Sequence, residues 1–217
     1  DPPEERRMPS PPILLASNNS HKRAEILRLL GLREGTLLSP GEVANDPPTP
    51  AEDGQSYLEN AVIKARAFSL WARLTALADD TGLEVSALGG RPGLRTARYA
   101  GPDAGDRANL DRLLEELAEV REDRRQARFV CVLALCRGEE TLFEARGVCP
   151  GRITTAPRGG GGFGYDPIFV PEGETRTFAE MAESEKDRIS HRGRALRLLS
   201  EALAAGRLPL RGGPGGR

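Results

Sequence analysis

Lysine is scarce in this chain. Only three of its 31 basic residues are Lys, although the chain has 217 residues. Arg presents a planar fork of donors, whereas Lys carries a compact charge on a flexible stem that suits a phosphate oxygen or a single acceptor. We therefore interpret Lys22, Lys64 and Lys186 as sites where Arg would not fit. The alternative is that a general preference for Arg left three lysines by chance.

Excess charge of one sign and long apolar runs are also absent. The formal net charge is −1, which does not predict the basic face of a protein that binds duplex nucleic acid or anionic membranes. A small anion held in a local basic pocket is still compatible with this charge. No apolar run reaches the roughly 20 residues of a membrane helix, and the first stretch, DPPEERRMPSPP, is too polar for a secretory signal. We expect no nucleic-acid partner and no membrane partner.

Cysteine is rare and irregularly spaced. The three cysteines, Cys131, Cys136 and Cys149, form no C-x-x-C pair. We expect all three to be reduced and buried in a cytoplasmic protein. Cys131 and Cys136 have opposite parity within an apolar run, so their side chains should face opposite sides of a strand.

The composition predicts one ordinary globular domain. Apolar residues make up 38% of the chain and charged residues 29%, and a chain of this length can bury a core. We expect a flexible leader over residues 1–12, a single domain over residues 13–205 and a flexible tail over residues 206–217.

Strand and helix patterns alternate along the domain. Gly31 follows an amphipathic stretch as a C-cap residue, and Ser56 with Glu59 three residues later matches a capping box. Helices interleaved with strands indicate an α/β or α+β domain with a mixed sheet. The predicted strands are 13–16, 77–80, 83–88, 127–136, 141–148 and 168–170, and the predicted helices are 22–30, 56–73, 106–120 and 191–205.

The first of five polar segments, S-N-N-S-H-K at 17–22, lies at a strand-to-helix turn. Hydroxyl groups, amides and free backbone N–H groups at a helix N-terminus make an anion site, and Lys22 adds a charge. The alternative is an ordinary N-cap at Asn19 or Ser20. The Walker pattern is absent, so the turn is not an ordinary P-loop.

The second segment covers residues 52–64 and leads into a predicted helix. Asn60 and Lys64 are four residues apart, so they share one helix face and can reach a phosphate or a carboxylate together. Glu59 is assigned to the cap. Glu52 lies just before the helix and is free to reach a metal ion.

The third segment, A-D-D-T-G at 78–82, places two carboxylates at the end of an apolar run. Ligands of open α/β sheets gather at the carboxyl ends of strands. With Glu52, the Asp79 and Asp80 carboxylates would suit Mg²⁺, which prefers oxygen ligands. The alternative is a simple turn.

The fourth segment, G-G-G-G-F-G-Y-D-P at 159–167, satisfies G-x-G-x-x-G literally. Tyr-Asp-Pro follows it instead of a helix, so we reject a dinucleotide fingerprint. The glycines indicate a mobile loop that presents Phe163 and Tyr165, on which a purine could stack for ~1–3 kcal/mol. The alternative is that Phe163 anchors the core.

The fifth segment covers residues 184–193 and precedes the last predicted helix. Lys186, His191 and Arg192 gather here and offer donors for a carbonyl oxygen or a phosphate. The alternative is a solvated run of charges in which Ser190 is an N-cap.

Together the five segments resemble the inosine triphosphate pyrophosphatase family, whose substrates are purine nucleoside triphosphates with deaminated bases. The resemblance extends from Ile13 to about Leu203. It rests on S-x-N-x-x-K at 17–22, E-x-G-x-[ST]-[FY]-x-E-N-A at 52–61, A-D-D-T-G-L at 78–83, G-G-F-G-Y-D-P-I-F at 161–169 and K-x-x-I-S-H-R-G at 186–193.

The resemblance implies an elongated α/β fold, in which helices flank a mixed twisted sheet and two lobes form a central cleft. It also implies a cytoplasmic homodimer that depends on Mg²⁺. The implied reaction is hydrolysis of ITP, dITP and XTP to the monophosphate and pyrophosphate, which removes deaminated purines from the nucleotide pool.

By position, the resemblance implies that Asp80 is the catalytic acidic residue and that Glu52, Asp79 and Asp80 bind the metal. Asn18 stands where Gly is usual, so we expect a left-handed conformation there, and Thr81 stands where Ser is common. The implied substrate-binding residues are Ser17, Asn18, Asn19, Ser20, His21, Lys22, Lys64, Thr81, Phe163, Gly164, Tyr165, Asp166, Lys186, His191 and Arg192.

Two other functions stay open. A non-catalytic nucleotide-binding protein would use the same pocket, although the intact Glu52, Asp79 and Asp80 argue against it. A Maf-type nucleotide pyrophosphatase, related in fold, would act on pyrimidine or modified nucleotides, but the F-G-Y-D and S-H-R-G segments favour purines. A cation such as Lys186 or Arg192 near a 6-oxo group would favour hypoxanthine and xanthine over adenine.

Overall fold

One mixed sheet organises the molecule. A computed structural model describes residues 12–208, in which six strands form a sheet in the order β2-β1-β3-β4-β5-β6. β1 is parallel to β2 and β3, whereas the other pairs are antiparallel, which confirms the predicted mixed sheet. The strands are β1 (Ile13–Leu15), β2 (Leu37–Leu38), β3 (Ala76–Val85), β4 (Gln126–Arg137), β5 (Glu140–Ile153) and β6 (Phe169–Pro171).

β3 differs from the prediction in a way that matters for the site. Two short strands were expected over 77–80 and 83–88, and this expectation is wrong. A single strand runs through the Asp-Asp-Thr-Gly segment, because every residue of β3 pairs with β4, from Ala76 opposite Cys136 to Val85 opposite Ala127. Residues 86–88 form a short 3₁₀ helix instead.

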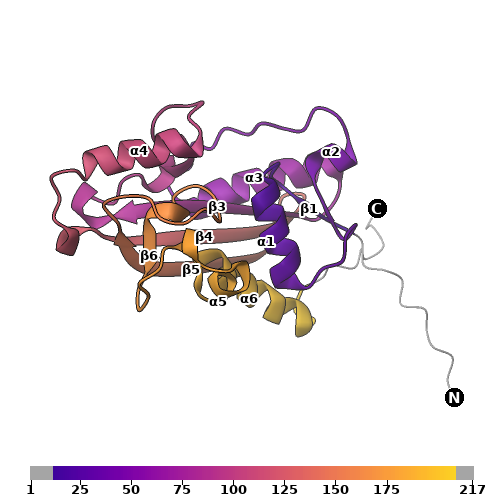
Figure 1. The fold of residues 1–217 in the computed structure, drawn as a ribbon. Coiled ribbons are helices and arrows are strands. Elements are labelled where there is room, and N and C mark those ends of the chain that lie inside the picture. Colours follow the sequence, from indigo (N-terminus) through magenta and orange to yellow (C-terminus); the bar gives the residue numbers. More distant parts are fainter. Residues whose placement is uncertain (1–11, 209–217) are drawn as a thin grey trace, which may run out of the picture.

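Helices cover both faces of this sheet (Figure 1). α3 (Tyr57–Ala72) packs on one face, over a buried cluster that contains Cys136. α1 (Ser20–Leu30) and α6 (His191–Ala204) pack on the other face, over a cluster that contains Cys131. The two cysteines therefore face opposite ways, as predicted.

A second lobe stands at the far end of the sheet. α4 (Asp106–Glu116) lies there, away from α1 and α6 (Figure 1). A third buried cluster joins Leu110 and Leu113 of α4 to Phe129 on β4 and Phe169 on β6. The predicted elongated arrangement of two lobes is confirmed.

Other boundaries differ from the prediction by a few residues. The helix expected over 106–120 ends at Glu116. The strand expected over 141–148 continues to Ile153, because its last residues pair with β6 as well as with β4. Residues 166–168 form a 3₁₀ helix, so β6 begins one residue later. Shorter helices are α2 (Pro40–Val43), the 3₁₀ helix η2 (Gly93–Arg98) and α5 (Glu183–Ile189), and of these η2 and α5 contribute residues to the pocket described below.

Several expectations concern single residues or the ends of the chain. The three cysteines are free and buried, as predicted. Residues 1–11 of the expected leader and 209–217 of the expected tail lie outside the described residues. Within residues 12–208, none of the helices combines the length and the apolar character required to cross a membrane.

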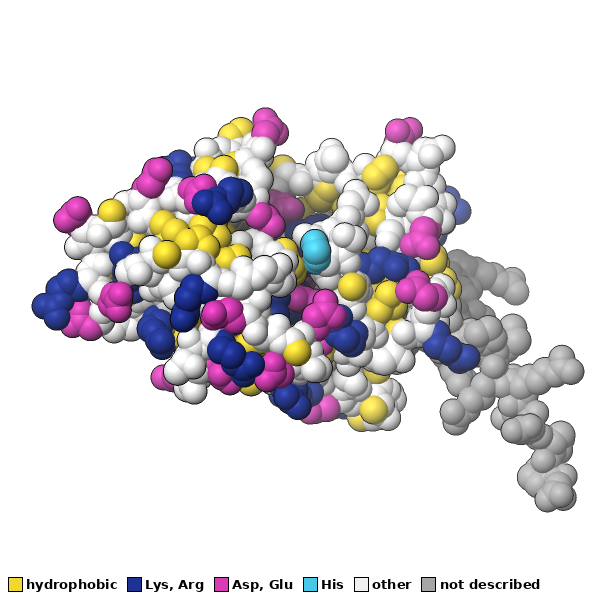
Figure 2. Space-filling model, viewed as in Figure 1, with side chains coloured by type: hydrophobic (Ala, Val, Ile, Leu, Met, Phe, Trp, Pro, Cys, Tyr) yellow, Lys and Arg dark blue, Asp and Glu magenta, His cyan; other side chains and the backbone are white. Residues whose placement is uncertain are grey.

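The surface carries both signs of charge side by side. On the face shown in Figure 2, Lys and Arg side chains are interspersed with Asp and Glu, and no large patch of one sign forms. This distribution agrees with the net charge of −1. The face that is visible there does not offer the basic surface that duplex nucleic acid requires.

Candidate active site

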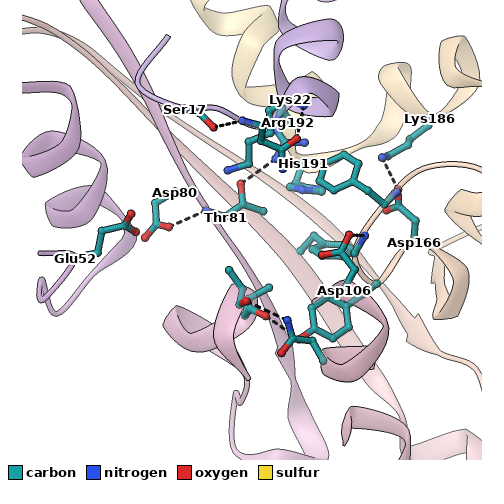
Figure 3. Close-up of a pocket in the computed structure, with 18 of the residues that line it drawn as sticks. Ser17, Lys22, Glu52, Asp80, Thr81, Asp106, Asp166, Lys186, His191 and Arg192 are labelled. Carbon is teal, nitrogen blue, oxygen red and sulfur yellow. Dashed lines mark hydrogen bonds and ion pairs between the residues drawn. The ribbon is translucent and has the colours of Figure 1, made fainter. Parts of the chain in front are cut away.

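One pocket brings the five polar segments together (Figure 3). Its volume is about 310 Å³, and α1 and α6 border it on one side and α4 on the other. Four predicted residues, Asn18, Ser20, His21 and Asp79, do not line it. The predicted residues that do are Ser17, Asn19, Lys22, Glu52, Lys64, Asp80, Thr81, Phe163, Gly164, Tyr165, Asp166, Lys186, His191 and Arg192.

α4 and η2 contribute residues to the pocket that the sequence motifs do not predict. Asn109 is buried, donates from Nδ2 to the Ala97 carbonyl at 3.0 Å and accepts from the Ala100 amide at 2.8 Å. Two polar residues three apart in the first turn of an apolar-faced helix were the available signal. The unassigned lining residues are Thr96, Ala97, Asp106, Asn109 and Phe129.

The turn between β1 and α1 forms one end of the pocket. Asn19 is the N-cap of α1, and its Oδ1 accepts from the Lys22 amide at 3.1 Å. Ser17 Oγ accepts from the Asn19 amide at 3.1 Å. The N-cap at Asn19 is confirmed, and it does not exclude an anion site, because capping fixes the helix N-terminus beside the pocket that Lys22 lines.

The expected left-handed conformation of Asn18 is wrong. Among residues 12–208, the only residues other than Gly with positive φ are Asp46 and Arg73. The chain instead approaches the helix in an extended conformation, with Asn19 at φ −75° and ψ 109°, so no residue of this turn requires a glycine. Asn18 and Ser20 are exposed.

Asp79 is held by cations inside the protein. Its Oδ2 lies 3.0 Å from Lys22 Nζ and 3.2 Å from Arg192 Nη2, and it also accepts from Thr81 Oγ1 at 3.1 Å. Burial would raise the pKa of this carboxyl, but the Lys22 and Arg192 charges outweigh burial and hold the pKa well below its usual range. Asp79 therefore anchors two of the cations of the pocket.

Asp80 points to the other side of β3, toward Glu52 (Figure 3). Asp80 Oδ2 accepts from Asn60 Nδ2 at 3.1 Å, and Glu52 Oε1 lies 3.1 Å from Lys64 Nζ. Burial raises the pKa of the Asp80 carboxyl. The Lys64 charge and the hydrogen bond from Asn60 lower this pKa, the Glu52 charge raises it, and the net result is an increase. Two carboxylates therefore line the pocket beside one lysine, whose charge offsets only one of their two negative charges.

The three predicted metal ligands are divided between two environments. Consecutive residues of a strand point to opposite faces of the sheet, so Asp79 cannot join Asp80 and Glu52 on the same side. In the part of the chain that the structure describes, no three His, Cys, Asp or Glu residues form a group that could hold a metal ion. Only Glu52 and Asp80 of the predicted set line the pocket.

Glu25, which the sequence analysis missed, ties together the donors at the other end of the pocket. Its carboxylate lies 2.9 Å from Lys186 Nζ and also pairs with Arg192. Lys186 Nζ makes a second ion pair with Asp166 Oδ2 at 2.7 Å. Burial would lower the pKa of Lys186, but Asp166 and Glu25 outweigh it and raise the pKa, so the ammonium stays charged.

His191 completes this end of the pocket as a neutral ring. It is buried and stacks on Phe129, with ring centroids 4.5 Å apart. Burial, together with Arg192 and Lys186, holds the pKa of His191 well below its usual range. Its Nδ1 is buried and finds no hydrogen-bond partner among the described residues. This nitrogen is therefore a hydrogen-bonding group at the pocket whose capacity the described residues leave unused.

The glycine-rich loop covers the same end. Phe163 is half-buried at the pocket and belongs to none of the buried apolar clusters, so it does not anchor the core of the described residues. The Phe163 amide donates to Asp166 Oδ2 at 3.0 Å. A Cβ at Gly162 would lie 2.0 Å from that same oxygen, and φ is +68° there, so glycine is required.

Comparison with known proteins decides the family. The model of the Ham1 family matches residues 13–202. The chain belongs to the Ham1 family. A dITP/XTP pyrophosphatase of Mycobacterium bovis is 50% identical to it over 195 residues, covering 88% of this chain and 94% of that protein. One of Shigella flexneri is 46% identical over 196 residues, covering 89% and 98%.

A solved Ham1 structure confirms the fold. The HAM1 protein of Coxiella burnetii superposes with a TM-score of 0.80 at 42% identity, covering 90% of this chain and 99% of that one. The resemblance that the five sequence segments carry is therefore confirmed for the family and for the α/β architecture. The Ham1 match covers both lobes and every residue that lines the pocket.

Proposed function

We propose that this Ham1-family chain hydrolyses dITP, XTP and ITP to the nucleoside monophosphate and pyrophosphate. Relatives that are 44–50% identical over most of their length carry the name dITP/XTP pyrophosphatase. One observation supports the proposal most strongly: a single pocket joins a helix N-terminus and two lysines at one end to buried, charged donors at the other. The triphosphate of a nucleotide would bind at the first end, and its purine base would bind at the second.

The phosphate end is built from the first two polar segments. The capped N-terminus of α1 presents free backbone N–H groups, which favour an anion. Lys22 and Lys64 both line the pocket and add two positive charges. We assign these lysines to the β- and γ-phosphates, where they would stabilise the charge of the departing pyrophosphate.

The donors beside the lysines fit Mg²⁺. Glu52 and Asp80 offer carboxylate oxygens, and Mg²⁺ is usually held by one or two carboxylates together with substrate phosphates. Their mutual repulsion, which contributes to the raised pKa of Asp80, is what a cation would relieve. Bound there, the metal would neutralise phosphate charge and activate water for attack. Asp79 is not needed as a ligand, because Lys22 and Arg192 already hold it.

The chain's own groups orient the reaction at this end. Asn60 donates to Asp80 Oδ2, and the Thr81 amide donates to Asp80 Oδ1 at 3.1 Å. These two bonds fix the carboxylate on the pocket side of β3. We assign Asp80 as the catalytic residue because it is a half-buried carboxylate of the pocket that forms no ion pair with a cation among the described residues.

The base end would select the 6-oxo group of hypoxanthine and xanthine. Lys186 and Arg192 are charged and held by buried carboxylates, so they cannot turn away from the pocket at low cost. An adenine amino group would meet these cations with donor against donor. The unpaired Nδ1 of His191 adds one further polar contact.

The first test is pyrophosphate release from ITP, dITP, XTP, ATP, GTP and dUTP, with Mg²⁺ and with EDTA. We expect metal-dependent release from the first three at rates at least ~100-fold above the others, which corresponds to about 2.7 kcal/mol of discrimination. Tight binding of ITP without any release would favour a nucleotide-binding protein instead. Preferred hydrolysis of dUTP would favour the pyrimidine or modified-nucleotide alternative.

We further propose that the enzyme works as a cytoplasmic homodimer and that residues 13–205 fold as one domain. The resemblance to the family supports the dimer, and the three free, buried cysteines are compatible with a reducing compartment. Light scattering on the purified chain measures the mass directly. A mass of 23.4 kDa, that of one chain, at micromolar concentration would contradict the dimer.

A further inference from the structure

The glycine-rich loop, residues 159–165, is contacted from the phosphate end of the pocket by His21. The His21 ring stacks on Phe163, with centroids 5.2 Å apart and planes 17° apart. His21 is exposed and is not a lining residue, so it supports Phe163 without standing in the pocket. It follows the Asn19 N-cap by two residues and precedes Lys22, and therefore belongs to the turn assigned to the phosphates.

The same loop is contacted from the other lobe by Asp106. The Gly164 amide donates to Asp106 Oδ2 at 2.8 Å, across 58 residues of sequence. Asp106 is the first residue of α4 and lines the pocket (Figure 3). Its side chain makes no ion pair with any residue in 12–208, so the loop amide is its principal partner.

Apart from these two contacts, the tip of the loop is held by two hydrogen bonds with Asp166: the Phe163 amide donates to Asp166 Oδ2 at 3.0 Å, and the Asp166 amide donates to the Phe163 carbonyl at 3.2 Å. The base of the loop is fixed where the Gly161 amide donates to the Ala179 carbonyl at 3.0 Å. Gly159, Gly162 and Gly164 all have positive φ, and a glycine-rich backbone has the greatest conformational freedom to lose. The Phe163 ring also lies near cations, with Lys186 Nζ 4.9 Å from its centroid.

We propose that His21 and Asp106 are positioning residues that hold Phe163 and Gly164 across the pocket and thereby set the affinity for the substrate. The identity of that substrate rests on the proposed function. A loop that is ordered before the nucleotide arrives loses less entropy on binding. The His21 stack also joins the phosphate turn to the loop at the base end, so the two ends of the pocket are mechanically linked.

Matched variants separate this role from general damage. His21→Ala removes the stack and His21→Phe keeps an aromatic ring, while Asp106→Ala removes the acceptor and Asp106→Asn keeps an acceptor oxygen. We expect each alanine variant to raise KM for dITP by roughly three- to tenfold, the size of one stacking contact or hydrogen bond. We expect kcat to change less than about twofold, because the contacts do not touch the reacting phosphates. The two conservative variants should restore KM.

Hydrogen exchange gives a readout that needs no activity. Without ligand, the peptide covering residues 159–166 should exchange faster in His21→Ala than in the native protein, although the Asp106 contact is intact there. Asp111→Ala is the control on the same helix, because among residues 12–208 the Asp111 carboxylate pairs only with exposed Arg107, at 2.8 Å. This control should leave both loop exchange and KM at native values.

Two results would overturn the inference. Native loop exchange in both alanine variants would show that His21 and Asp106 do not hold the loop, even if dITP is hydrolysed. Calorimetry on the products gives the second test: if His21→Ala weakened binding of pyrophosphate but not of IMP, His21 would act on the phosphate turn alone. If the native chain cleaved neither dITP nor XTP, the proposed function would fail, while the exchange experiment would still decide the role of the loop contacts.

Discussion

Asp79 and Asp80 are adjacent in the sequence but lie in opposite electrostatic surroundings. Asp79 is buried against Lys22 and Arg192, whereas Asp80 faces the pocket with Asn60 as its side-chain donor. The sequence identifies both carboxylates as candidates. It does not show their separate roles, because these depend on which face of β3 meets the cations from α1 and α6.

The Asp80→Asn variant should lose activity without losing stability. We expect kcat to fall by ~10²-fold or more, the usual size of an acid–base or metal contribution, while the melting temperature stays near the native value. Pyrophosphate release and thermal unfolding measure the two effects. Near-normal turnover would remove Asp80 from the catalytic role.

The neighbouring Asp79→Asn variant, unlike Asp80→Asn, should lose stability. Removing this charge leaves Lys22 and Arg192 with a buried partner missing, a change that typically costs about 3–5 kcal/mol. Urea unfolding should therefore show a large loss in the free energy of unfolding. A stability equal to that of Asp80→Asn would contradict the anchoring role of Asp79.

Lys186 should influence the choice of base, not only the rate. We expect Lys186→Met to lower the preference for ITP over ATP by at least ~10-fold, because the charge that meets the 6-oxo group is lost. The matched control is Lys64→Met at the phosphate end, which should slow both substrates to the same extent. An unchanged ratio in Lys186→Met would contradict the assignment.

At the scale of elements, β3 and the start of α3 fit together through a glycine. Tyr57, the first residue of α3, packs against Gly82 and donates from its hydroxyl to Glu84 Oε1 at 3.2 Å. The sequence predicts both motifs but not their contact. It also suggests a break in β3, because Asp and Gly are poor strand formers, and only the pairing with β4 overrides that preference.

Gly82→Ala should disturb the site through α3. A Cβ at Gly82 would lie 2.2 Å from the Tyr57 hydroxyl oxygen, so the ring must move and shift the helix that carries Asn60 and Lys64. We expect a loss of about 1–3 kcal/mol in stability, the usual cost of overpacking, together with a lower kcat. Adding Tyr57→Ala should restore part of the stability. An additive loss in the double variant would show that the two residues do not clash.

At the scale of the whole molecule, the sequence predicts the family and every strand of the sheet except β2, although it divides β3 in two. Its periodicity and its five segments are strong signals. It does not predict the role of Glu25, since one carboxylate in an amphipathic helix has the pattern of a solvated residue. The partners of Glu25, Lys186 and Arg192, are more than 160 positions away in the sequence. The contribution of α4 to the pocket was missed for the same reason. Both depend on how the two lobes meet.

The buried His191 should make folding sensitive to mild acid. Its folded-state pKa lies well below the usual value because of burial, so below about pH 6.5 the unfolded chain binds a proton that the folded chain does not. The free energy of unfolding should therefore fall as the pH falls, by up to about 1.4 kcal/mol per pH unit. Urea unfolding between pH 7.5 and 5.5 measures this slope. His191→Gln should flatten it, and an unchanged slope in that variant would assign the effect elsewhere.

The reactivity of the buried cysteines can be used to measure when the helices separate from the sheet. Burial raises the pKa of Cys131 to about 12 and that of Cys149 to about 11, so neither thiol offers a thiolate to an alkylating reagent while the strands stay together. Cys131 and Cys136 occupy opposite faces of β4. Iodoacetamide labelling of the intact protein would therefore time the separation of the helices from each face, and simultaneous labelling at both positions would mean that the two layers open as one unit.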